Sequence, residues 1–489
     1  MKSRLFRHAA VVLAAALTLA AAGCGGTKTG VSAQSGTSLV RSGALAYVSI
    51  DSDLGSSQWK QVDSLAKKFP GRNQALAYFK HELAKQGVDY NRDVKPAVGP
   101  EVDIAVLRGA TPKDTAFAVL TKPEDGGKYK ALVKKLNAHD TSGKPAVYRK
   151  VGGWYALSES QKMIDRVLAK GGASLSDDST FKQALGELPK DALAKAYVNS
   201  RQLGGLIKQA SQESDSPLGS FAFGFDKLDF ISAALSAEND GLRLHGVAKG
   251  PGAGQFGRNY KSKLIDGVPA DALGFLTFRG TGLRKQFGQL ESKPAVRKGF
   301  EQFRRVVGVS VDDLLALFGG ETGFYARPGA LIPEFTLVLT PRQPGRAVAT
   351  LNTLARRIAS FTGATITGGA EKTVDFGPVS IRYGAAKDKV IVTNSANGVA
   401  TFGAPGKKLP DSAAFKDAKS AAGMPGSNAG FFYIDVKGSV RLIESLAGLA
   451  GDQSLPPEVT GNLRPLRSFL AWGTVSGDTG TFDAFLEIK

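Results

Sequence analysis

Short runs of alternating apolar and polar residues recur along the chain, interleaved with longer runs in which apolar residues repeat every three or four positions. In the run 101–106, Val102, Ile104 and Val106 would share one face of a strand. Two helical stripes precede it: Trp59, Val62, Leu65, Ala66 and Phe69, and then Leu76, Phe79 and Leu83 before a stop at Gly87. These patterns predict strands and amphipathic helices within one fold.

Two hairpins are predicted, at 230–244 and at 469–488. The first turns at Asn239-Asp240-Gly241, and the second turns within 477–480. Neighbouring strands joined in this way pair antiparallel. The expected class is therefore α+β, with mainly antiparallel sheets and packed helices rather than a doubly wound parallel sheet.

The chain also resembles itself over a long range. Four segments recur in the same order: 101–105 as 321–325, 118–121 as 337–340, 180–184 as 414–418, and 196–199 as 432–435. Collinear echoes predict an internal duplication with two homologous domains, 39–249 and 268–489. A linker, 250–267, would join them through the glycine-rich stretch 250–257.

The first 23 residues have the pattern of an export signal. Lys2, Arg4 and Arg7 precede an apolar run, 9–22, which is shorter than the roughly 20 residues needed to cross a bilayer. Cys24 is the single cysteine of the chain and follows directly. The next residues are rich in Gly, Ser and Thr, so we expect a flexible tether over 24–38.

The segment Ala21-Ala22-Gly23-Cys24 resembles the lipid-attachment box of bacterial lipoproteins. The resemblance implies that the Cys24 sulfur carries a diacylglycerol, that fatty acids such as palmitate anchor the mature chain, and that the chain lies on the extracytoplasmic face of the cell membrane. Ala21 stands where that family usually has Leu, so ordinary cleavage at Ala20-Ala21-Ala22 is the alternative. Both alternatives export the protein.

A second resemblance covers most of the mature chain. The duplicated layout, Ser49-Ile50-Asp51, Gln58-Trp59-Lys60, Phe69-Pro70 and Val94-Lys95-Pro96 up to Gly99 are similar to a family of bacterial envelope lipoproteins known only as a domain of unknown function. This resemblance implies a fold and supplies no catalytic residues.

Charge and composition limit the possible partners. The formal net charge is +19, and removal of Lys2, Arg4 and Arg7 leaves 19 − 3 = +16. Outside the cytoplasm, a basic surface favours anionic lipids or acidic wall polymers. The basic residues, such as Arg304 and Arg305, lie on predicted helices without interleaved aromatics, so nucleic acid is not an expected partner. A single cysteine excludes disulfides within the chain and thiolate metal clusters.

Two short motifs suggest chemistry but lie in the wrong context. The segment 252–257 matches G-x-G-x-x-G, yet it falls between the predicted copies rather than between a parallel strand and a helix. Ser57 and Lys60 match S-x-x-K, but Trp59 and Val62 assign the segment to a packing helix. We expect neither a nucleotide site nor a nucleophilic serine.

Metal ligands are equally sparse. Asp51 and Asp53 resemble the start of a calcium loop, but Val62 stands where its closing Glu would be, so helix capping is the favoured interpretation. His81, His139 and His245 are far apart in sequence. We therefore predict no metal, no cofactor and no catalytic residue.

Three functions are compatible with these features. The first is a noncatalytic lipoprotein that binds or scaffolds a partner at the cell envelope, anchored through Cys24. The second is a carrier of a lipid or another lipophile, and the third, least favoured, is a hydrolase of envelope polymers. The sequence does not determine the oligomeric state.

Overall fold

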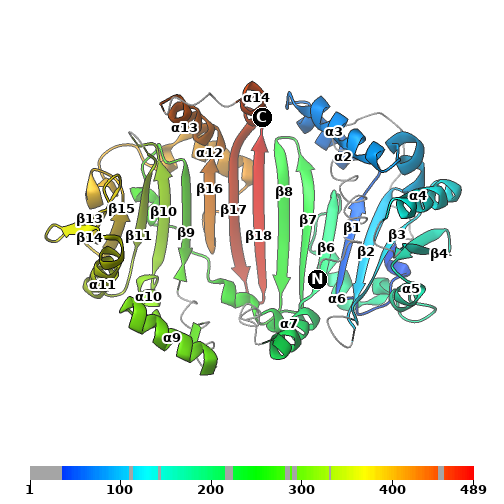
Figure 1. Ribbon diagram of the computed structural model, residues 1–489, viewed down its shortest axis with the longest axis horizontal. Coiled ribbons are helices and arrows are strands. Elements are labelled where there is room, and N and C mark those ends of the chain that lie inside the picture. The colour runs from blue at the N-terminus through cyan, green and yellow to red at the C-terminus, as the bar shows by residue number, and fades with distance from the viewer. Residues whose placement is uncertain are drawn as a thin grey trace. The chain divides into compact units, whose positions relative to one another are not determined.

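The computed structural model describes residues 36–109, 114–140, 145–214, 224–280, 287–288, 294–329, 332–449 and 456–489. These residues form two compact units, which meet in sequence between Ala253 and Gly254. Unit 1 consists of the residues before this boundary together with Ile488 and Lys489, and unit 2 continues from Gly254 to Glu487. Each unit is a mixed structure of helices and an antiparallel sheet, which confirms the predicted α+β class at that level (Figure 1).

The strands of unit 1 are β1 (Ala46–Asp51), β2 (Glu101–Leu107), β3 (Ala116–Thr121), β4 (Val147–Val151), β5 (Trp154–Ser158), β6 (Ala194–Asn199), β7 (Phe230–Glu238) and β8 (Gly241–Lys249). They pair antiparallel in the order β4-β5-β3-β2-β1-β6-β7-β8. The predicted hairpin at Asn239 and Asp240 is the β7–β8 connection.

The helices of unit 1 are α2 (Ser57–Ala66), α3 (Arg72–Lys85), α4 (Gly126–Ala138), α5 (Gln161–Val167), α6 (Ser179–Gly186) and α7 (Ser200–Ser214). Local capping explains several starts. The Ser56 side chain accepts a hydrogen bond from the Trp59 amide at the start of α2, and Asp125 caps α4 in the same way. The predicted stripes bury Trp59 and Leu65 on α2, and Phe79 and Leu83 on α3.

Unit 2 contains β9 (Gly274–Arg279), β10 (Glu321–Arg327), β11 (Glu334–Leu339), β12 (Thr365–Thr367), β13 (Lys372–Asp375), β14 (Ser380–Ala386), β15 (Lys389–Thr393), β16 (Gly430–Asp435), β17 (Leu466–Ser476) and β18 (Thr479–Ile488). Antiparallel pairing gives the order β12-β13-β14-β15-β11-β10-β9-β16-β17. β18 lies beside β17, and the hydroxyls of Thr474 and Thr481 are hydrogen bonded between the two strands (Figure 1).

The helices of unit 2 are α9 (Pro294–Val307), α10 (Val311–Leu317), α11 (Pro344–Thr362), α12 (Ala413–Ala422), α13 (Val436–Leu449) and α14 (Pro457–Leu463). Glycines in the left-handed conformation end α11 and α12, at Gly363 (φ +75°) and Gly423 (φ +72°).

The two sheets share one pairing scheme. The central strand of unit 1, β1, lies between β2 and β6, and β9 lies between β10 and β16 in the same way. β2 continues to β3 and β5, as β10 continues to β11 and β15. Three pairs of echoed segments overlap strands that occupy equivalent places in these schemes, and the fourth pair overlaps the helices α6 and α12.

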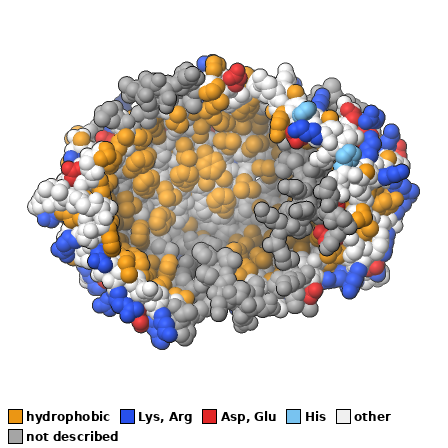
Figure 2. All heavy atoms as spheres, in the orientation of Figure 1, with side chains coloured by type: hydrophobic (Ala, Val, Ile, Leu, Met, Phe, Trp, Pro, Cys, Tyr) orange, Lys and Arg blue, Asp and Glu red, His pale blue; other side chains and the backbone are white. Residues whose placement is uncertain are grey.

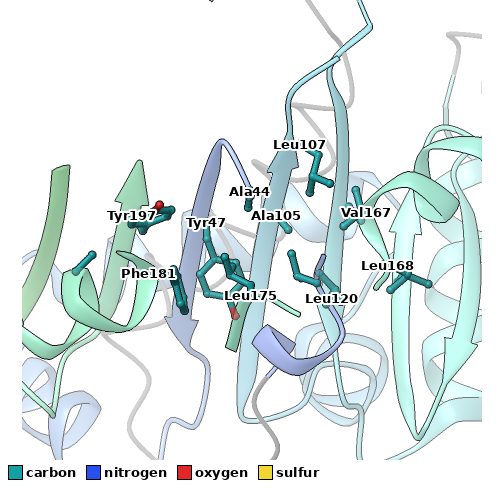
Figure 3. Close-up of a cluster of buried hydrophobic side chains, with 14 of the residues drawn as sticks. Ala44, Tyr47, Ala105, Leu107, Leu120, Val167, Leu168, Leu175, Phe181 and Tyr197 are labelled. Atoms are coloured by element: carbon teal, nitrogen blue, oxygen red, sulfur yellow. The ribbon is translucent and has the colours of Figure 1, made fainter. Parts of the chain in front are cut away.

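The core of each unit is built around aromatic rings that α6 or α12 places on the sheet. In unit 1, Phe181 of α6 makes edge contacts with Tyr47 and Tyr197, at ring distances of 5.4 and 5.1 Å (Figure 3). In unit 2, Phe415 of α12 contacts Tyr433 at 5.0 Å and Phe431 at 6.1 Å. Buried aliphatic residues surround both groups of rings.

The predicted tether and the predicted linker both contain packed residues. At the end of the predicted tether, Gly36 and Thr37 are buried in a short 3-10 helix, η2 (Gly36–Ser38). In the predicted linker 250–267, Tyr260 and Leu264 are buried, and Leu264 belongs to the core of unit 2. Apolar side chains therefore fix residues 260–264 to unit 2, although glycines precede them.

The buried Glu321 carboxylate also holds this segment. It accepts hydrogen bonds from the Ser262 hydroxyl at 2.5 Å, the Lys263 amide at 3.1 Å and the Thr277 hydroxyl at 3.0 Å. A buried carboxylate with several donors is stable in this position.

Candidate functional site

Each sheet has a core face, covered by α6 or α12, and an opposite face that we call the open face. Successive residues of a strand alternate between the two. On β10, Tyr325 points into the core and is fully buried, whereas Phe324 lies on the open face and is 39% exposed. The same alternation separates Tyr433 from Phe432 on β16.

Two neighbouring rows of paired residues cross the open face of unit 2 without a polar side chain. One row is Val392, Leu337, Phe324, Leu276, Phe432 and Ala471, and the other is Phe335, Ala326, Gly274, Ile434 and Phe469. Since adjacent strands lie about 4.8 Å apart, the first row is about 24 Å long.

Several of these apolar residues are accessible. Phe335 is 44% exposed and Phe432 is 36% exposed. The rings of Phe324 and Phe335 stack at 6.0 Å, and Phe432 contacts Phe469 at 6.2 Å. Figure 2 shows hydrophobic side chains gathered on this face of the unit 2 sheet. A contiguous accessible apolar surface is typical of a binding site.

Helices cover one edge of this face. Leu317 of α10 and Ala347 of α11 pack with Leu339 and Val390, at the β11–β15 edge. Phe318, which follows α10, stacks on Phe278 of β9 at 6.3 Å. The covered edge therefore includes Leu337 and Val392, at one end of the first apolar row.

Unit 1 has an open face of the same kind. Its two rows are Leu157, Val119, Ile104, Val48, Ala196 and Ala233, and Phe117, Val106, Ala46, Val198, Ile231 and Ala248. At one edge, Tyr155 and Leu157 of β5 join α3 and α4 in a cluster, as their strand neighbours Trp154 and Ala156 enter the core. The predicted shared face of Val102, Ile104 and Val106 is this open face.

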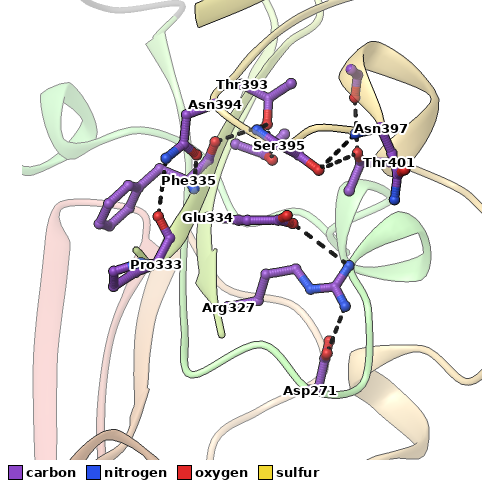
Figure 4. A network of polar contacts seen from close by, with 12 residues as sticks. Asp271, Arg327, Pro333, Glu334, Phe335, Thr393, Asn394, Ser395, Asn397 and Thr401 are labelled. Carbon is purple, nitrogen blue, oxygen red and sulfur yellow. Dashed lines mark hydrogen bonds and ion pairs between the residues drawn. The ribbon is translucent and has the colours of Figure 1, made fainter. Parts of the chain in front are cut away.

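A polar pocket of about 690 Å³ lies elsewhere in unit 2. Arg327, Asp271, Thr401 and Lys408 are among its lining residues. The Arg327 guanidinium pairs with Asp271 at 2.7 Å and lies 3.9 Å from Glu334 (Figure 4). These ion pairs fasten the end of β10 to Asp271 and to Glu334 of β11.

An unusual buried group lies on the core face of unit 1. Asp103 is completely buried, and neither carboxylate oxygen has a hydrogen-bond partner among the described residues. Burial raises the pKa of this carboxyl well above its ordinary value, and the neighbouring Glu101 raises it further. Burial likewise raises the pKa of Tyr47 well above its usual range. The alternation of β2 predicted no special role for Asp103.

The residues that sequence analysis singled out do not converge on one site. Cys24, the predicted lipidation site, lies outside the described residues. Ser57 and Lys60 are exposed at the start of α2, and the glycines 252–257 follow a hairpin strand and surround a one-turn 3-10 helix, η9 (Ala253–Phe256). Neither arrangement has the geometry of the motif that it matches.

The paired aspartates act in local capping. Asp51 Oδ2 accepts a hydrogen bond from the Ser56 hydroxyl at 2.6 Å, and Asp53 Oδ1 accepts one from the Gly55 amide at 2.8 Å. Partial burial raises the pKa of Asp51 to about 6. His81 and His139 are exposed, and His245 is half-buried.

The described ranges contain no group of three or more His, Cys, Asp and Glu side chains placed to hold a metal ion. In the same ranges, no helix has both the length and the apolar character needed to span a bilayer.

Comparison with protein families assigns this sequence to one of them. The sequence matches the family described as "Protein of unknown function (DUF3352)" over residues 8–133 and 137–487. The chain therefore belongs to the DUF3352 family, which agrees with the predicted domain of unknown function. A search of curated proteins found no match.

Solved structures that resemble this chain include crystal forms of TP0453. Form I has 14% identity and a TM-score of 0.25, over 46% of this chain and 78% of that chain. Form IV has 11% identity and a TM-score of 0.23, over 46% and 93% of the respective chains. At these TM-scores the similarity supports no conclusion about fold or function.

Proposed function

We propose that this DUF3352 protein is an exported, membrane-anchored lipoprotein without catalytic activity, and that it binds a lipophilic ligand on the open faces of its sheets. The proposal combines two of the functions suggested by the sequence: the noncatalytic binding protein and, for its ligand, the lipid or lipophile of the carrier hypothesis. The observation that carries the proposal is the pair of apolar rows on each open face.

The chemistry of these rows selects the ligand. Sugars, nucleotides and peptides carry polar groups that need hydrogen-bond partners when they leave water. The two rows offer aliphatic and aromatic side chains instead, including the accessible Phe324, Phe335 and Phe432. An acyl chain needs no polar partner and gains about 0.8 kcal/mol for each buried methylene.

The dimensions of the face agree with such a ligand. Leu337 and Val392, at one end of the first row, pack in the clusters of α10 and α11. The rest of the row, from Phe324 to Ala471, extends over about 14 Å, close to the roughly 15 Å of hydrocarbon in one leaflet of a bilayer. Most of an acyl chain can therefore lie along it, across the strands.

The N-terminal sequence supports the proposed location. A basic start, a short apolar run and Cys24 in a lipoprotein-like box favour a signal peptide over 1–23 and an acylated, palmitate-bearing anchor. We propose that the protein is held in this way on the extracytoplasmic face of the cell membrane.

We also propose that the two units arose by duplication. Support comes from the shared pairing scheme and from equivalent core residues. Tyr47 pairs with Tyr197 beside Phe181, as Phe275 pairs with Tyr433 beside Phe415. The duplicated open faces would give the molecule two ligand sites of related shape.

Titration with a fluorescent fatty acid tests the ligand class. The titrated protein carries Cys24→Ser, which removes the proposed anchor. A variant that also carries Phe324→Gln/Phe335→Gln lacks the stacked rings of the unit 2 face. Because a buried Phe contributes about 1.5–3 kcal/mol, we expect unit 2 binding to weaken at least tenfold. Tyr78→Gln, which changes an exposed ring on α3, is the control and should bind normally.

Equal binding by the double variant and the control would contradict the unit 2 site. Absence of saturable binding to the Cys24→Ser protein would contradict the lipophile itself. Circular dichroism distinguishes either outcome from a loss of folding.

A further inference from the structure

Helix α9 is strongly amphipathic and weakly packed. Val296, Phe300, Phe303 and Val307 form one apolar stripe, whereas Arg297, Lys298, Arg304 and Arg305 are exposed on the rest of its surface. None of the residues from 296 to 307 is fully buried. Charge within 297–305 consists of four basic residues and Glu301, so this segment has a net charge of 4 − 1 = +3.

The end of α11 has a similar character. Ile358 is 46% exposed and Phe361 is 70% exposed, beside the exposed Arg356 and Arg357. The Arg357 guanidinium lies 4.9 Å from the Phe361 ring centre, in a cation–π contact.

A hydrogen bond joins the two helix ends. Arg357 Nε donates to the carbonyl oxygen of Val306, at 2.5 Å, and Val306 itself is 50% exposed. Val306, Ile358 and Phe361, together with Arg304, Arg305, Arg356 and Arg357, therefore form one surface, which we call the arginine-rimmed patch. Figure 1 shows α9 and α11 on the same side of unit 2.

We propose that the arginine-rimmed patch docks unit 2 on a bilayer rich in anionic lipid. Large exposed side chains are costly in water but can enter the boundary between headgroups and acyl chains, and arginines can remain among the phosphates. Each basic residue near an anionic bilayer adds to the attraction, which salt screens. Charge complementarity thus favours an anionic lipid surface over an acidic soluble ligand, which would leave the three apolar side chains in water.

This docking is independent of the proposed ligand site. The patch is connected to that site through α10, which begins four residues after α9 ends and is followed by Phe318, whose ring stacks on Phe278 of the open face. Lipid drawn from the docked bilayer would therefore enter beside the apolar rows.

Vesicle flotation tests the proposal. The probe is the mature chain with Cys24→Ser, mixed with vesicles of phosphatidylcholine alone or with one third phosphatidylglycerol. We expect binding to the anionic vesicles only, and at least tenfold weaker binding for Arg304→Gln/Arg305→Gln and for Phe361→Ser. Lys128→Gln/Lys130→Gln removes the same charge from exposed positions on α4, where Tyr129 is buried, and should bind within about twofold of the parent.

Three outcomes would overturn the proposal. The first is that the protein does not bind anionic vesicles, and the second is that the two double variants weaken binding equally. The third is that the protein forms a dimer in solution which Phe361→Ser abolishes, because that result would assign the patch to contact with a second copy of the chain. Fatty-acid titration of the same variants separates this proposal from the ligand site, since the patch variants should titrate normally. Thermal unfolding by circular dichroism identifies a variant that loses binding through misfolding.

Discussion

Two buried acidic residues of the sheets have opposite surroundings. Glu321 accepts hydrogen bonds from Ser262, Lys263 and Thr277, whereas Asp103 has no such partner among the described residues. Asp103 also restricts the residue type at position 36, because a Cβ added at Gly36 would lie 2.0 Å from Asp103 Oδ2. A glycine is therefore required where η2 packs on the carboxyl group.

The raised pKa of Asp103 gives stability a defined pH dependence. An unfolded aspartate titrates near pH 4, so between that pH and its higher folded pKa the folded protein binds more protons than the unfolded chain. The free energy of unfolding should therefore fall as the pH rises from about 4. Asp51, whose pKa is about 6, adds a fall of the same sign that ends near pH 6.

We predict that Asp103→Asn reduces this loss of stability between pH 4.5 and 7.5, because the amide does not titrate. Urea unfolding at several pH values measures the difference. The Asp51 contribution remains in the variant and serves as an internal control. Parallel pH profiles for the two proteins would show that Asp103 titrates normally.

The sequence patterns predicted the elements more completely than their packing. Alternation over 101–106 correctly placed Val102, Ile104 and Val106 on one face, but a period of two does not tell which face the helices cover. The core face of β2 carries Asp103, Ala105 and Leu107, so an acidic residue occupies the inward side. For this reason the open face could not be identified from the sequence.

Aromatic packing supplies a test at the scale of elements. Phe181→Ala should destabilise unit 1, and Phe415→Ala should destabilise unit 2, each by about 3–5 kcal/mol, because each ring fills an equivalent place between helix and sheet. Hydrogen exchange should show faster opening of β1 and β6 in the first variant and of β9 and β16 in the second. Unchanged exchange in either case would contradict the equivalence of the two cores.

At the scale of the whole molecule, the α+β class and the family were predictable, because alternating runs and echoed segments are local in sequence. The binding surfaces were not, since each depends on residues that the fold brings together. Phe324 and Phe432 lie on either side of Leu276 of β9, and the Arg357 side chain of α11 donates a hydrogen bond to the carbonyl oxygen of Val306 of α9. The net charge predicted an anionic partner without showing where the charge would act.

The proposed anchor also limits the distance of the protein from the bilayer. Gly36 lies twelve positions after Cys24, and an extended chain of that length spans at most about 43 Å. The packed body would therefore remain near the lipid surface, where ligand and docking surface would both be available.

Mass spectrometry of the protein extracted from the envelope tests the central claim most directly. The parent chain should begin at an acylated Cys24, and the Cys24→Ser chain should still retain a noncovalent acyl-chain lipid that Phe324→Gln/Phe335→Gln reduces. A Cys24→Ser protein that is folded but free of lipid, and that takes up none from added fatty acid, would contradict the account.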